Sequence, residues 1–249
     1  MNRYENYALN EQKLIRKFFK NKTNGTCIEV GSNEPVDYRS QSNHLEKKLN
    51  WNCYLIEPNI DLVRKTKLLR PKAKVINCAC VQPELDQKYL KLFIPKTSSG
   101  VEVHGHASVQ KNIDEHNYSF FTELRVKGQT LDSIINKFQL NEIDLLSIDV
   151  EGYELEVLNG IDLTLNRPRL ILLEDKHLFL TKHNLLKKNN YTLVQRINRN
   201  CWYVANEIEK PKVTFFSKIR LYKRIYISLW FNKIKYSIRH KTISPFLRL

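Results

Sequence analysis

The sequence predicts an α/β fold in which a parallel β-sheet carries helices on both faces. Apolar runs of strand length alternate with helical patterns at least five times along the chain, which is typical of this fold class. The 249 residues are 42% hydrophobic and 27% charged. This is close to globular usage and excludes disordered, collagen-like and disulfide-scaffold chains. No apolar run approaches the ~18 residues that span a bilayer, so an integral membrane protein is not expected.

The first half of the chain contains three predicted strands, each near a helix. Five apolar residues recur at helical spacing over residues 9–20, which predicts the first helix. Apolar runs then predict strands at 26–30, 51–56 and 74–77, and helical patterns predict helices at 41–49 and 61–69. Residues 88–94 alternate with a period of two, which predicts an extra strand or a hairpin arm.

The second half repeats the alternation after a long irregular stretch at 96–118. A loop of that length in a compact domain is usually functional. We expect helices at 131–138, 153–158 and 178–188, strands at 144–148 and 170–173, and a terminal hairpin of residues 191–195 and 201–205.

Polar residues gather where the predicted strands end. Ligands of parallel sheets bind beyond the carboxyl ends of the strands, so these positions are the candidates for a functional site. They are Glu29, Gly31, Glu57, Asn77, Asp149, Glu151, Glu174 and His177.

Gly31 and Glu57 together indicate a nucleoside ligand. Gly31 would let the backbone approach a ligand, and a carboxylate after the second strand can accept the hydroxyl protons of a ribose. Alone, the glycine also suits an ordinary turn and the glutamate a solvated strand end. Ser32, Asn33 and Pro35 follow Gly31, so the G-x-G-x-x-G pattern of a pyrophosphate site is absent. S-adenosylmethionine, a nucleoside without a pyrophosphate, is therefore favoured over NAD.

Two further groups of residues supply candidate catalysts. Asp149 and Glu151 are spaced i, i+2 before Gly152, which can turn both carboxylates into one cleft. His177 follows Glu174, and histidine is the usual proton acceptor near neutral pH, although a surface-loop histidine is the simpler alternative. His104, His106 and His116 lie in the long loop, and His104 and His106 could join Asp149 around a metal ion, but we expect no metal.

The cysteines and the first residues indicate a reducing compartment. All but one of the five cysteines lie in strand-like apolar runs and none forms a CxxC pair, so we expect buried, reduced thiols. The chain starts without the apolar core of a signal peptide. We therefore expect a cytoplasmic protein.

The positive charge is concentrated in the last forty residues. Of the net charge of +15, residues 210–249 supply +11 without a single acidic residue, and residues 1–209 supply the remaining +4. Apolar residues recur at helical spacing in this tail, at Phe215, Ile219, Tyr222, Tyr226, Leu229 and Trp230. We expect a domain at 1–209 and a basic, amphipathic helical tail at 210–249. Residues 213–241 could contact an anionic membrane surface or an acidic-glycan assembly. Packing on the body or a partner subunit is the alternative, and nucleic acid is less favoured.

Several of these motifs together resemble the FkbM family of S-adenosylmethionine-dependent methyltransferases. The resemblance extends over residues 25–206. Its motifs are Ile28–Pro35, Ser42-Asn43, Leu45-Glu46, Asn50-Trp51, Ile56–Asn59, Arg70-Pro71, Asn77–Ala79, Thr130–Asp132 and, most specifically, Ile143–Glu154. Many members have a second glycine where this chain has Pro35.

The resemblance implies a Rossmann-like, doubly wound sheet of seven mostly parallel strands with an antiparallel C-terminal hairpin. It also implies an O-methyltransferase of a small polar or carbohydrate hydroxyl. The cofactor would contact Glu29, Gly31, Ser32, Asn33, Glu57, Asn77, Ala79 and Asp149, and the catalytic residues would be Asp149, Glu151, Glu174 and His177. The alternatives are an RNA methyltransferase and a non-catalytic module that binds membrane or nucleic acid.

Overall fold

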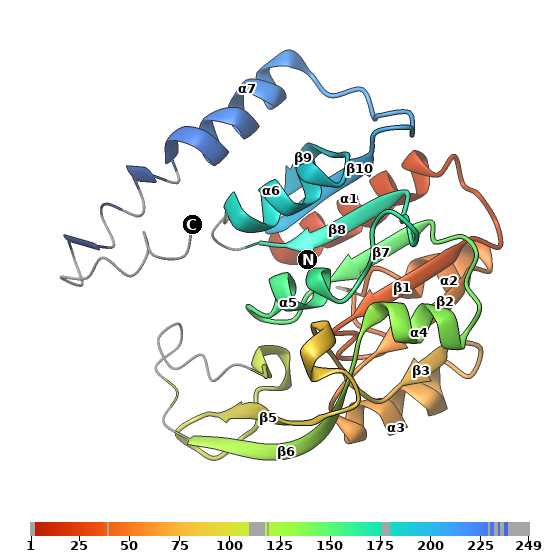
Figure 1. Ribbon diagram of the computed structural model, residues 1–249, viewed down its shortest axis with the longest axis vertical. Helices are drawn as coiled ribbons and strands as arrows, with labels where there is room; N and C mark the ends of the chain where they lie inside the picture. Colours follow the sequence, from red (N-terminus) through yellow and green to blue (C-terminus); the bar gives the residue numbers. More distant parts are fainter. Residues whose placement is uncertain are drawn as a thin grey trace. The chain divides into compact units, whose positions relative to one another are not determined.

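The computed structural model describes residues 3–38, 40–109, 118, 120–175, 180–228, 230–231, 234 and 237–238. One sheet has seven strands in the order β3-β2-β1-β7-β8-β10-β9, and a second has three in the order β4-β6-β5 (Figure 1). The predicted α/β fold with a mostly parallel seven-stranded sheet and an antiparallel C-terminal hairpin is confirmed. The chain divides into two compact units, Met1–Arg169 and Leu170–Leu249.

In the first unit, β1 (Thr26–Val30) lies between two parallel neighbours. It pairs with β2 (Asn52–Ile56) on one side and β7 (Leu145–Ile148) on the other, and β2 pairs with β3 (Lys74–Ile76). All four residues of β7 and four of the five in β1 are buried. Such continuous apolar runs are what strands covered on both faces require, and each of these strands lies within a residue of its predicted place.

The helices of this unit are α1 (Arg3–Phe18), α2 (Asn43–Leu49), α3 (Ile60–Leu69), α4 (Leu131–Lys137) and α5 (Glu154–Asn159). The side chains of Asn59 and Thr130 cap α3 and α4 by accepting backbone N–H groups. The first helix begins earlier than the prediction of residue 9. Residues 5–10 contain no buried side chain, so this end of α1 carries no apolar period that could be recognised.

A second sheet was predicted only in part. The expected extra strand is β5 (Tyr89–Lys96), and it pairs antiparallel with β6 (Phe120–Gln129), which the sequence analysis did not assign (Figure 1). β4 (Ala79–Cys80) pairs parallel with the end of β6. Two short 3-10 helices, η1 (Pro83–Leu85) and η2 (His104–His106), complete this region. The predicted loop at 96–118 is described up to residue 109 and at Tyr118.

The second unit contains the C-terminal hairpin and the tail. β10 (Asn200–Ala205) pairs antiparallel with both β8 (Leu170–Glu174) and β9 (Tyr191–Ile197), and α6 (Leu180–Lys188) precedes the hairpin. The predicted helical tail is α7 (Phe215–Lys223), which continues into the π-helix η3 (Arg224–Ser228).

All five cysteines are buried, as predicted. Burial raises the pKa of the Cys78 and Cys201 thiols to about 12, because a thiolate is poorly solvated in an apolar interior. Both thiols therefore stay protonated at neutral pH and pack in the core as uncharged side chains. Among the described residues, no helix is both long and apolar enough to cross a membrane.

Candidate functional site

The sheet register brings three predicted site residues to one edge of the first unit. Val30, the last residue of β1, is level with Ile56 at the end of β2 and with Ile148 at the end of β7. The next residues along each strand are Gly31, Glu57 and Asp149. The strand order also reverses at β1, and ligands of doubly wound sheets bind at that position.

Gly31 is in direct contact with the turn that follows β7. Its φ of +78° is one that side-chain-bearing residues rarely adopt. A Cβ at this position would lie 1.8 Å from the carbonyl oxygen of Asp149. The backbone N–H groups of Gly31 and Ser32 both donate to the carbonyl of Ile56, at 3.0 and 3.2 Å. Only glycine fits at this position, where the backbone after β1 contacts the end of β2 and the residue that follows β7.

The Glu57 carboxylate is buried and held in one orientation. Its side chain is 5% exposed. Oε2 accepts the backbone N–H of Asn33 and Oε1 that of Asn59, both at 2.9 Å. Asn77 donates its Nδ2 to the Glu57 carbonyl at 3.0 Å and so fixes the backbone as well. Burial raises the pKa of Glu57 to about 7, and the two N–H donors offset only part of that shift.

Two polar atoms beside Glu57 lack hydrogen bonds. Among the described residues, neither the Ser32 Oγ nor the Asn33 Oδ1 has a partner, although both atoms are buried. Ser32 is only 5% exposed, and Asn33 has a left-handed φ of 46°. Buried polar groups are rarely left unpaired. These two atoms, next to an oriented carboxylate, fit a polar ligand at the edge of the sheet.

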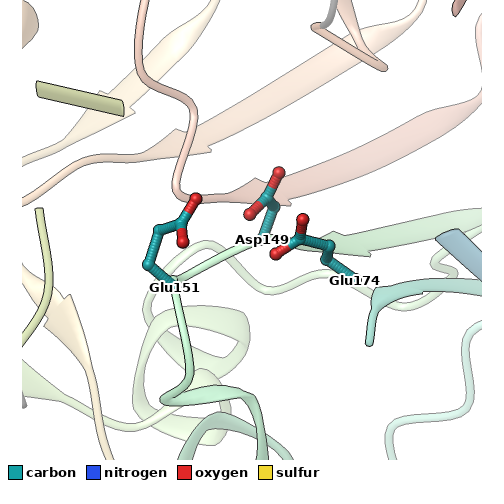
Figure 2. A group of neighbouring side chains, drawn as sticks. All are labelled: Asp149, Glu151 and Glu174. Atoms are coloured by element: carbon teal, nitrogen blue, oxygen red, sulfur yellow. The ribbon is translucent and has the colours of Figure 1, made fainter. Parts of the chain in front are cut away.

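Asp149 and Glu151 lie together after β7, as predicted from their spacing. Their carboxylate oxygens approach within 4.8 Å, and Figure 2 shows both side chains at the end of this strand. Glu151 and Gly152 have φ angles of 51° and 98°, and this left-handed turn brings the two side chains to the same side. Glu154 accepts the backbone N–H of Gly152 at 2.8 Å and thereby closes the turn.

Comparison with known proteins identifies the family. The family model of the methyltransferase FkbM domain matches residues 29–205. The chain belongs to the FkbM methyltransferase family. This confirms the resemblance seen in the sequence motifs.

Two solved methyltransferase structures are similar to parts of this chain. The FkbM methyltransferase from Methylobacillus flagellatus KT is 13% identical, with a TM-score of 0.43 over 74% of this chain and 44% of that chain. Precorrin-6y C5,15-methyltransferase from Geobacter metallireducens GS-15 is 9% identical, with a TM-score of 0.37 over 78% and 85%. The chain thus spans less than half the length of the first of these. No curated protein matches it.

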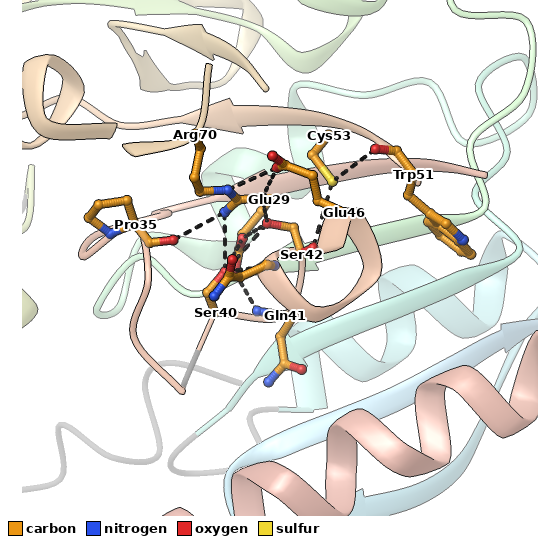
Figure 3. Close-up of polar contacts among 10 residues, drawn as sticks. Glu29, Pro35, Ser40, Gln41, Ser42, Glu46, Trp51, Cys53 and Arg70 are labelled. Carbon is orange, nitrogen blue, oxygen red and sulfur yellow. Dashed lines mark hydrogen bonds and ion pairs between the residues drawn. The ribbon is translucent and has the colours of Figure 1, made fainter. Parts of the chain in front are cut away.

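The FkbM domain match begins at Glu29, whose carboxylate is fully engaged inside the protein. It accepts the backbone N–H of Gln41 at 2.7 Å and the Ser40 Oγ at 3.0 Å, and it forms a further short hydrogen bond with the Ser42 hydroxyl (Figure 3). The side chain is 5% exposed. Glu29 was predicted to contact the cofactor; in this arrangement it holds the segment after β1 in place.

Arg70 extends this network and was not among the predicted site residues. It is 2% exposed, its Nε and Nη2 donate to Glu46 Oε2 at 2.9 and 2.6 Å, and Nη2 also donates to the Ser42 Oγ at 2.9 Å (Figure 3). Nη1 lies 3.5 Å from the carbonyl of Pro35. Arg70 therefore ties the end of α3 to α2 and to the segment after β1.

The other predicted residues lie as follows. Asn77 is exposed after β3, and Ala79 is 4% exposed at the start of β4, paired with Gly128. Glu174 ends β8 in the second unit, with its Oε1 3.6 Å from Arg199 Nη1. His177 lies outside the described residues.

The loop histidines have partners of their own. His104 Nδ1 lies 3.1 Å from Asn59 Nδ2, and His106 Nδ1 lies 2.8 Å from the Tyr118 hydroxyl. His116 is outside the described residues. The geometry therefore adds no support to a histidine metal site with Asp149.

Proposed function

We propose that this FkbM methyltransferase is S-adenosylmethionine-dependent and methylates a hydroxyl oxygen of a small polar or carbohydrate acceptor. A surface glycan or a secondary metabolite would be the product. The observation that carries the proposal is Glu57, a buried carboxylate oriented by two backbone N–H groups beside Gly31 and Asp149.

The residues at this edge fit the adenosyl group by their chemistry. Each Glu57 oxygen accepts one backbone N–H and retains a lone pair for a ribose hydroxyl. Ser32 and Asn33 offer the two polar atoms that have no partner among the described residues. Gly31 leaves the backbone accessible to a ligand. Asn77 and Ala79 would border the base, and Glu29 would act through the segment that it anchors.

The reaction would use the carboxylates after β7. S-adenosylmethionine, when bound, supplies an electrophilic methyl group. Asp149 would take the proton of the acceptor hydroxyl, and Glu151 would border the acceptor. Glu174 and His177 are the second candidates for proton transfer. Aligning the reacting groups can lower the barrier by up to ~7–11 kcal/mol, so positioning of the acceptor would supply much of the rate.

The Asp149→Asn variant tests the proposed role of Asp149. With a methyl-labelled donor, wild-type protein should transfer label to a hydroxyl compound in a screen of sugars and polar metabolites. Asp149→Asn should still bind S-adenosylhomocysteine in calorimetry, yet lose about 10²–10⁴-fold in turnover. The exposed Asp61→Asn is the matched control and should keep full turnover. Undiminished transfer by Asp149→Asn would remove Asp149 from the mechanism.

A further inference from the structure

The tail presents a row of large apolar side chains to the solvent. Over α7 and η3 these are Phe215 (71% exposed), Phe216 (80%), Ile219 (48%), Tyr222 (65%) and Ile227 (46%). Phe231, Ile234 and Ile238 continue the series at 61%, 46% and 73%. Apolar residues scattered singly over a surface are normal, but a contiguous set marks an interaction site. We call the residues from Phe215 to Ile238 named here the tail surface.

The segment that carries the tail surface is anchored within its own unit. Ile225 is only 4% exposed, and the Tyr226 hydroxyl lies 3.4 Å from Nε2 of His183 on α6, within the same unit. The rings of Tyr226 and Tyr222 are also in contact, tilted by 40° with their centroids 4.5 Å apart. The apolar side chains of the tail surface therefore stay exposed while the helix that carries them is held in place.

Positive charge surrounds the tail surface. Lys218, Arg220, Lys223 and Arg224 are exposed on the same helical segment. The sequence has no acidic residue after Glu209 and eleven lysines and arginines in its last forty residues. Combined with the exposed aromatic and aliphatic side chains, this is the composition of helices that lie in the interface of an anionic bilayer.

We propose that the tail surface binds an anionic membrane, with its apolar side chains in the headgroup–acyl boundary and its lysines and arginines on lipid phosphates. A second copy of the chain is a poor occupant, because eleven like charges on each tail would repel. Single-stranded nucleic acid suits the aromatic rings, which can stack on bases, but not Ile219, Ile227, Ile234 and Ile238. Burying those aliphatic groups requires an apolar partner such as lipid.

Vesicle co-sedimentation of the full chain tests this proposal. Vesicles of phosphatidylcholine with about 30% phosphatidylserine should pellet the protein, and phosphatidylcholine alone should pellet much less of it. Phe216→Ser with Tyr222→Ser, and separately Lys218→Glu with Arg220→Glu, should each weaken binding to the anionic vesicles by about tenfold or more. Thermal melts of both variants confirm that they remain folded.

Matched controls lie on the first unit. Leu68→Ser with Leu165→Ser removes two side chains that are 79% and 80% exposed, and Lys67→Glu with Lys72→Glu reverses two exposed charges. Both controls should bind like wild type. The proposal is overturned if tail and control variants bind alike, if both lipid compositions pellet the chain equally, or if only the charge variant has an effect and RNA competes.

Discussion

Glu57 shows how burial could make cofactor binding depend on pH. Its pKa is raised from the ordinary 4.5 to about 7 by burial. Because Glu57 keeps its proton to a higher pH in the folded chain than in the unfolded chain, its contribution to the free energy of unfolding is complete below pH 4.5. This contribution is lost as the pH rises through 7, and the loss is roughly 3 kcal/mol. Ribose hydroxyls donate to the charged form, so ligand binding should follow the opposite trend and strengthen as the pH rises through 7.

Gly31 gives a test of the contact between the β1 and β7 turns. Gly31→Ala would place a Cβ 1.8 Å from the Asp149 carbonyl oxygen at a φ of +78°. We expect a loss of more than about 2 kcal/mol in the free energy of unfolding, measured by urea denaturation, and a loss of S-adenosylhomocysteine binding.

Gly100 is the control for that substitution. Its φ of +82° is almost the same, but a Cβ there would meet no described atom within 4 Å. Gly100→Ala should therefore cost only the conformational strain, about 1 kcal/mol. Equal losses at Gly31 and Gly100 would show that the contact with Asp149 does not matter.

The segment between β1 and α2 is shaped by elements on every side of it. Glu29 on β1 binds Ser40, Gln41 and Ser42, and Arg70 at the end of α3 binds Ser42. α1 adds Gln12, whose Nε2 donates to the Tyr38 carbonyl at 2.7 Å. The segment follows Ser32 and Asn33 directly, so these contacts fix the backbone on which the proposed ligand atoms depend.

Arg70→Met measures how much this network contributes to the free energy of unfolding. Removing one partner leaves Glu46 charged and poorly solvated, with 11% side-chain exposure. The expected loss in the free energy of unfolding is about 3–5 kcal/mol, with weaker S-adenosylhomocysteine binding, by chemical denaturation and calorimetry. Arg64→Met removes the exposed pair with Asp61 and should cost at most about 1 kcal/mol. Similar losses in both variants would contradict a buried anchoring role for Arg70.

Strands with continuous apolar runs were predictable, whereas the partly exposed strand β6 was not. β1 and β7 can be recognised in the sequence because strands that are covered on both faces consist of nearly continuous apolar residues. β6 mixes exposed and buried residues over ten positions, and its pairing with β5 depends on a contact far along the chain. Arg70 was missed for a similar reason: arginine is usually a surface residue, and only the folded chain reveals that it is 2% exposed.

The site was predictable at the level of strand ends but not of hydrogen bonds. Parallel register alone brings Gly31, Glu57 and Asp149 to one edge. That Glu29 is engaged by the following segment depends on where Ser40 and Ser42 fold back, which no local pattern records. The same holds for the unpaired atoms of Ser32 and Asn33.

The sequence combines a region that matches the FkbM family model with a strongly basic tail. The FkbM match ends at residue 205, before α7 begins at Phe215. The predicted boundary after residue 209 stays a prediction, and the compact units divide instead between Arg169 and Leu170. The proposed methyl transfer and the proposed membrane contact therefore involve different residues and can be tested independently.

Calorimetric titration of S-adenosylhomocysteine at pH 6 and pH 8 tests the central claim, that Glu57 holds an adenosyl ligand. With a pKa of about 7, affinity should rise about tenfold between the two pH values. Glu57→Gln should bind more weakly and lose this pH dependence, because an amide cannot accept both backbone N–H groups. Absence of binding by the wild type, or an affinity of Glu57→Gln that equals that of the wild type at both pH values, would contradict the claim.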